Sequence, residues 1–176
     1  MRPIRAGGQY GGMRDLRWEE VSGWFDPEEM GTLPDLRVPG TTAEHWQALL
    51  DLVVAGGWRH EYAQGDAVRP LPRAAQVLGR PPGAECPQLR VWPARDMLAV
   101  FRFLGPQEID FDVDLRELQG QERLDLFCGF LRAIGRHLHR PVLMDPEGAH
   151  GHAILGYDPS TDRVALASDV PPGPRR

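Results

Sequence analysis

Residues 97–114 read MLAVFRFLGPQEIDFDVD, and this stretch predicts two neighbouring strands of one sheet joined by a Gly-Pro turn. Within residues 109–114 apolar and acidic residues alternate strictly, so the apolar side chains face one side of the strand and the aspartates the other. If the phenylalanines of both strands face the core, Arg102 lies opposite or diagonal to Asp112. The two side chains would then form a cross-strand ion pair.

The pattern continues on both sides of this stretch. Residues 121–138 carry apolar side chains at three- and four-residue steps, which predicts a long helix with one buried face. Short apolar runs bounded by turn residues predict further strands at 89–93, 141–145, 152–158 and 163–167. We therefore expect an α+β fold, with a mainly antiparallel β-sheet and helices packed on one face.

The N-terminal third predicts two helices, over residues 14–25 and 42–55. The second should be capped by Thr41 in a capping box and should bury Trp46, Leu49, Leu50 and Val53. Asp26 is placed to cap a further short turn. Alternation predicts a strand over 58–62. The Pro- and Gly-rich segment 65–87 predicts a long loop with one short helix near 73–78, and loops of this length often have a function.

The chain is expected to form one α+β domain over residues 13–167. Residues 1–12 form a Gly-rich stretch typical of a flexible leader, and residues 168–176 form a Pro-rich stretch typical of a flexible tail. No apolar run approaches the roughly 20 residues that span a bilayer. The N-terminal residues lack the apolar region of a secretory signal, so a cytoplasmic location is expected.

All twenty basic residues are arginines, and the chain has neither lysine nor asparagine. Both missing residues have A-rich codons, which indicates a bacterium with a GC-rich genome. Without lysine there is no P-loop of the usual kind, no Schiff-base catalysis and no covalent pyridoxal-phosphate site. Without asparagine the kinase catalytic loop is excluded as well. We expect no cofactor.

One group of residues raises the alternative of a metal-dependent enzyme. His150 and His152 share one side of an extended segment and lie close in sequence to Asp145, and all three are residue types that bind zinc or iron. However, no HExxH pair is present. The nearby His137 and His139 lie about 200° apart on a helix and cannot share an ion.

A second alternative is a small-molecule binder with an aromatic pocket, because four tryptophans cluster early in the chain. These are Trp18, Trp24, Trp46 and Trp58. Such residues more commonly supply bulk to a core. Of the two cysteines, Cys128 lies on the apolar side of the long predicted helix and is expected to be a core residue, and Cys86 lies in the long loop.

The charge distribution favours a third function, binding to another protein. The net charge is −5, residues 13–51 hold nine acids against three arginines, and residues 97–126 hold seven against three. The arginines form no compact basic run, which argues against nucleic acid, and no membrane interaction is expected. Regional acidity steers association with a basic protein. It is equally typical of a solvated strand face that serves solubility.

The preferred prediction is therefore a non-enzymatic domain, of an immunity or regulatory type, that binds a basic protein through an acidic sheet face. The residues expected to contact the partner are Glu108, Asp110, Asp112 and Asp114.

Overall fold

A computed structural model describes residues 15–167 of the chain. The stretches predicted as leader (1–12) and tail (168–176) lie outside this range. The helical elements are α1 (Trp18–Val21), η1 (Ser22–Phe25), α2 (Pro27–Met30), α3 (Ala43–Ala55), α4 (Ala74–Leu78), η2 (Leu115–Glu117) and α5 (Gln121–Leu138). The strands are β1 (Asp35–Pro39), β2 (Arg59–Gln64), β3 (Ala67–Arg69), β4 (Gln88–Ala94), β5 (Met97–Arg102), β6 (Glu108–Val113), β7 (Val142–Asp145), β8 (Leu155–Asp158) and β9 (Arg163–Leu166).

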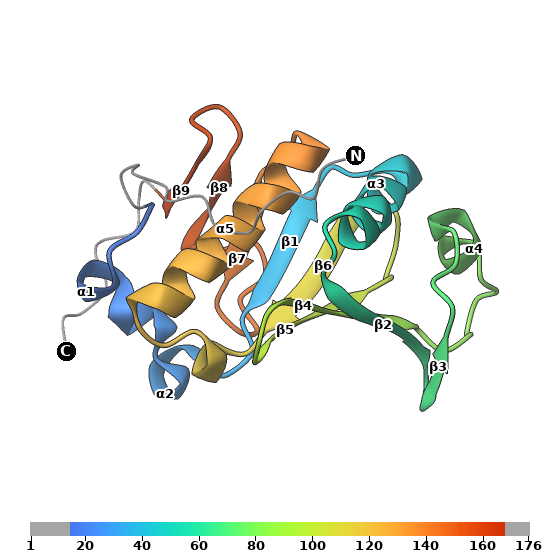
Figure 1. Cartoon of the computed structure of the whole chain (residues 1–176), viewed down its shortest axis with the longest axis horizontal. Coiled ribbons are helices and arrows are strands. Elements are labelled where there is room, and N and C mark those ends of the chain that lie inside the picture. The colour runs from blue at the N-terminus through green and yellow to red at the C-terminus, as the bar shows by residue number, and fades with distance from the viewer. Residues whose placement is uncertain (1–14, 168–176) are drawn as a thin grey trace.

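The nine strands form one sheet in the order β3-β2-β4-β5-β6-β1-β7-β8-β9, and every neighbouring pair is antiparallel. The predicted α+β class is therefore confirmed. The strands β4, β5 and β6 follow one another as a meander. The strand β1 comes from much earlier in the chain and lies between β6 and β7, so it joins the meander to the C-terminal strands (Figure 1).

The helices α3 and α5 lie on the same side of the sheet (Figure 1). Trp46 of α3 stacks on Phe103 with ring centroids 4.6 Å apart, and Phe130 of α5 meets Phe101 and Phe111 edge to face. We call the sheet face under these helices the inner face and the opposite one the outer face. Apolar residues of the strands point to the inner face, so the polar residues between them point to the outer one.

Several predictions are confirmed closely. The helix α5 has the predicted bounds, and its predicted apolar face is buried. It ends at His139, which adopts the left-handed conformation that terminates many helices. The pair Phe101 and Phe111 stack directly opposite each other in the β5–β6 ladder. None of the helices within residues 15–167 is long and apolar enough to cross a bilayer.

Two predictions about helix ends are wrong. The helix expected over residues 14–25 is instead the two short elements α1 and η1, and buried Gly23 lowers the helix propensity of the second part, which is a 3-10 helix. The cap of α3 is Thr42, whose side chain accepts a hydrogen bond from the backbone of His45. Thr41 instead donates its hydroxyl to the carbonyl of Pro106 at 2.8 Å.

Two strands were not predicted. Residues 65–87 were expected to hold only one short helix, and α4 is present, but β3 forms a hairpin with β2 across Gly65. The five-residue strand β1 is the larger omission because it lies in the middle of the sheet. Its sequence DLRVP alternates as a strand should, with Leu36 and Val38 buried.

Candidate functional site: a carboxylate patch on the outer sheet face

Three adjacent strands near the middle of the sheet, β6, β1 and β7, bring five carboxylates together on the outer face. In the β1 ladders, Asp35 lies opposite Asp112 on one side and Asp145 on the other. Glu108 and Asp110 precede Asp112 at two-residue steps along β6 and so point to the same face. We call these five residues the carboxylate patch.

Asp145 is neutralised inside the protein. It is completely buried, and Arg37 of β1 donates from Nε to its Oδ2 at 2.8 Å. The backbone N–H of Gly151 donates to the same oxygen at 2.9 Å. A buried carboxylate with an arginine and a backbone donor is well compensated, whereas removing one partner would leave an isolated buried charge.

Asp112 is neutralised by the neighbouring strand. Nη1 of Arg102 lies 2.5 Å from its Oδ2, and the two residues are diagonal to each other in the β5–β6 ladder. The ion pair predicted from the alternation is therefore confirmed. The Arg102 side chain is 37% exposed, so the pair meets solvent at its outer end.

Asp110 lies between these two ion pairs and belongs to neither. Its direct ladder neighbours are Arg37 on β1 and Arg102 on β5, but their guanidinium groups turn to Asp145 and Asp112. Asp110 instead hydrogen-bonds Glu108, a second carboxyl group. Burial, followed by the hydrogen bond to Glu108 and its charge, raises the pKa of Asp110 to about 7.

The loop between β7 and β8 covers one edge of the patch. Nε2 of His150 lies 3.7 Å from Glu108, and Nδ1 lies 3.9 Å from Asp145. The backbone of Gly148 hydrogen-bonds Asp35. The pKa of Asp35 is nevertheless raised, mainly by burial and then by neighbouring carboxylates. The patch thus carries more acid than its internal cations compensate.

Asp114, the last aspartate of the predicted stripe, has a different local role. Strand β6 ends at Val113, and Asp114 caps η2 by accepting a hydrogen bond from the backbone of Arg116 at 2.9 Å. Nη2 of Arg116 lies 2.7 Å from its carboxylate, and these contacts lower the pKa of Asp114. Of the four residues predicted to contact a partner, the structure gathers Glu108, Asp110 and Asp112 in the patch.

The alternative metal site is not assembled. Across residues 15–167, no three side chains of His, Cys, Asp or Glu are grouped so that they could hold an ion. Asp145 is already engaged by Arg37, and His152 is exposed in the loop. His150 is the one of the three candidates that approaches the patch while remaining largely exposed.

The early tryptophans enter separate contacts. Trp46 is fully buried against Phe103. Trp18 packs on Phe25, and Trp58 meets Phe130 of α5. These three tryptophans therefore lie in separate parts of the core and its edge. Cys128 is buried as predicted, and burial raises the pKa of its thiol to about 12, which makes it unreactive.

Sequence reasoning missed Asp35 and Arg37 as site residues because it missed β1. The signal was present in the alternation of DLRV between Pro34 and Pro39. No family model matches the chain, and the searches of curated proteins and of solved structures gave no match either.

Proposed function

We propose that this protein is a non-enzymatic domain that binds a basic protein through the carboxylate patch. The observation that carries the proposal is the Glu108–Asp110 pair, which lies between two arginines that both neutralise other carboxylates. A guanidinium or ammonium group from a partner would supply the missing cation. The regional acidity of the sequence supports the same partner chemistry.

The raised pKa of Asp110 supports this proposal through linkage. A carboxyl group that holds its proton near pH 7 must release it to pair with a cation, so binding should strengthen as pH rises through 7. A patch that served only solubility would need neither a shared proton nor partial burial, because solvated carboxylates remain ionised well below pH 7.

The test compares two double variants as baits for a partner from the source cells, followed by binding kinetics. Glu108→Gln with Asp110→Asn removes the patch pair. Glu28→Gln with Glu29→Gln removes two exposed acids of α2, which buries no side chain. The proposal expects one basic protein that is retained by the wild type and the α2 variant and lost by the patch variant.

For that protein, the association rate with the wild type should fall as salt is added, since long-range charge attraction is screened. The salt dependence should be weaker with the patch variant. Equal retention of every captured protein by the two double variants would contradict the proposal.

A further inference from the structure

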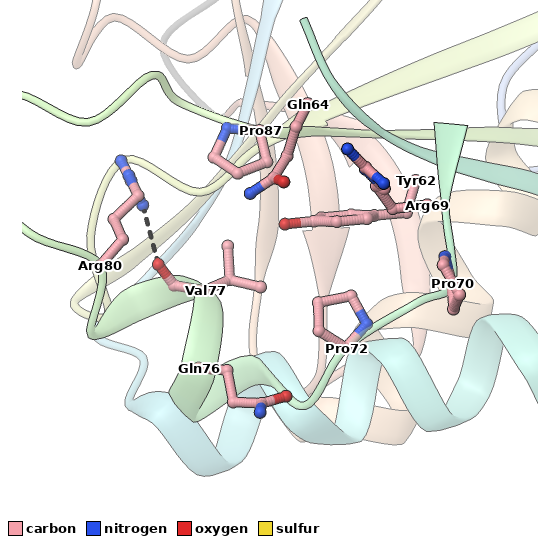
Figure 2. A pocket seen from close by; sticks show the side chains of 9 residues that line it. All are labelled: Tyr62, Gln64, Arg69, Pro70, Pro72, Gln76, Val77, Arg80 and Pro87. Carbon is pink, nitrogen blue, oxygen red and sulfur yellow. Dashed lines mark hydrogen bonds between the residues drawn. The ribbon is translucent and has the colours of Figure 1, made fainter. Parts of the chain in front are cut away.

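A second feature lies at the opposite end of the sheet from β9, where residues 65–87 fold against β2. The segment forms part of a pocket of about 330 Å³, which Figure 2 shows from close by. This volume is within the range of about 300–1,000 Å³ that is usual for small-molecule sites. Its lining comes from β2, β3, the link to α4, α4 itself, Arg80 just after α4 and Pro87 just before β4.

The pocket has two arginines and no carboxylate among its nine lining residues. Arg69 makes no ion pair with any carboxylate of residues 15–167. Arg80 donates only from Nη1, to the backbone carbonyls of Val77 at 3.1 Å and Phe103 at 2.8 Å. Its Nε and Nη2 therefore keep their donors available, while the two carbonyls hold the side chain in place.

Of the other arginines on the strands, Arg59 lies over the ring of Trp92, and three are paired with acids. Arg37, Arg90 and Arg102 each have a carboxylate partner within the chain. In a chain with a net charge of −5, two arginines without an acid at one pocket make a local site of positive charge. Guanidinium groups bind phosphate and carboxylate groups through paired hydrogen bonds.

Tyr62 supplies a third polar group. It lies directly opposite Arg69 in the β2–β3 ladder, and Figure 2 shows its hydroxyl pointing into the space between Gln64 and Val77. The side chain as a whole is only 5% exposed. Burial raises the pKa of its hydroxyl, so at neutral pH the group keeps its proton and can donate it in a hydrogen bond.

The walls of the pocket are fixed before any ligand binds. Pro70 and Pro72 restrict the backbone of the link between β3 and α4. The backbone of Ala74 donates to the side chain of Gln47 at 2.8 Å, which ties α4 to α3, and Ala74 and Val77 are buried. A site that is already ordered loses little conformational entropy on binding.

We propose that this pocket binds a small organic anion, with its phosphate or carboxylate group held by Arg69, Arg80 and the Tyr62 hydroxyl. The apolar part of the ligand would lie against Val77 and the prolines. This inference goes beyond the proposed function, because it concerns a different ligand and different residues. It also gives a purpose to the long segment between β2 and β4.

The experiment is a titration of the isotope-labelled full chain, followed by amide chemical shifts in NMR spectra. The probes are phenyl phosphate, benzoate, inorganic phosphate and the neutral benzyl alcohol. We expect saturable shifts at Gln64, Arg69 and Val77 with phenyl phosphate, benzoate or both, and the preferred probe identifies the anionic group. Inorganic phosphate should bind more weakly than the preferred aromatic anion.

Three variants localise the binding. Arg69→Gln should weaken the affinity for the preferred anion about tenfold or more, because a charged hydrogen-bond donor is lost. Tyr62→Phe should weaken it by a smaller factor. Arg95→Gln is the matched control: this arginine is 95% exposed and pairs with its neighbour Asp96, so its loss should leave the affinity unchanged.

The proposal would be overturned by the absence of saturation below about 10 mM for both aromatic anions. It would equally be overturned if Arg69→Gln bound them as the wild type does, or if benzyl alcohol produced the same shifts. Inorganic phosphate binding as tightly as the aromatic anions would show an adventitious ion only. None of these outcomes bears on the carboxylate patch, which uses other strands.

Discussion

At the scale of single residues, the pKa of Asp110 depends on which carboxylates the neighbouring arginines pair with. Arg37 and Arg102 both lie opposite it, yet each pairs elsewhere. Arg37 turns to Asp145, whose complete burial makes an unpaired charge most costly. Arg102 turns to Asp112. Asp110 is left with Glu108, and two carboxyl groups in contact are stabilised by sharing a proton.

This arrangement predicts an unusual dependence of stability on pH. The pKa of Asp110 is raised in the folded protein, so the folded state binds more protons than the unfolded state between about pH 4 and about pH 7. Stability from this residue is therefore fully present at low pH and falls as pH rises through that window. Replacing Asp110 by Asn should remove the loss.

We expect Asp110→Asn to be more stable than the wild type at pH 8, and the difference to disappear near pH 4. Because Asp110 is only half-buried, solvent screening limits the gain to about 1 kcal/mol. The control is Asp112→Asn, which breaks the ion pair with Arg102 and should lose about 0.5–1 kcal/mol at pH 8. Urea denaturation at several pH values measures both. If the wild type were more stable than Asp110→Asn at pH 8, the raised pKa of Asp110 would not be the cause of the pH dependence.

At the scale of secondary-structure elements, α5 contains two glycines with opposite requirements. A side chain at Gly135 would collide with the ring of Tyr157 on β8, whereas one at Gly129 would meet nothing within 4 Å. Gly129→Ala should therefore stabilise the protein by about 0.5–1 kcal/mol through helix propensity. Gly135→Ala should destabilise it by about 1–3 kcal/mol through overpacking. Thermal unfolding of the two variants checks this. If the two substitutions changed the stability in the same direction, β8 would not approach α5 as described.

The buried side of the same helix makes a second prediction. Leu131 is completely buried and Leu126 is 41% exposed. Leu131→Ala should cost about 2–5 kcal/mol because it opens a cavity under the helix. Leu126→Ala is the matched control and should stay within about 0.5 kcal/mol of the wild type. Chemical denaturation measures both, and a loss below about 1 kcal/mol for Leu131→Ala would place the core on a different face.

The elements also show which features were predictable from the sequence. The helix α5 was predicted correctly because its pattern is long and local. The strand β1 was missed because it has five residues, and its partners β6 and β7 lie more than 60 residues away in the sequence. The Arg102–Asp112 pair needed only two neighbouring strands and was predictable. The contributions of Asp35, Arg37 and Asp145 needed the order of the whole sheet.

At the scale of the whole molecule, the middle of the sheet and its β2–β3 end have opposite charge character. The central strands β6, β1 and β7 carry the carboxylate patch, and the β2–β3 end has a pocket with two arginines that lack acidic partners. The carboxylate patch lies on the outer face, whereas the pocket lies beside α4 on the inner-face side of the β2–β3 end, where Tyr62 meets Phe103 edge to face. This separation allows a protein partner and a small anion to be bound by different parts of one sheet.

The Glu108–Asp110 pair is the feature on which the proposed partner binding depends. The most direct measurement is an NMR titration of the Asp110 side-chain carboxyl carbon against pH in the free protein. The expected midpoint is about 7, and it should fall in Glu108→Gln, where the neighbouring charge is removed. A midpoint near the ordinary aspartate value of about 4 in the wild type would contradict the proposed role of this pair. The Asp110 carboxylate would then be ionised without any cation from a partner.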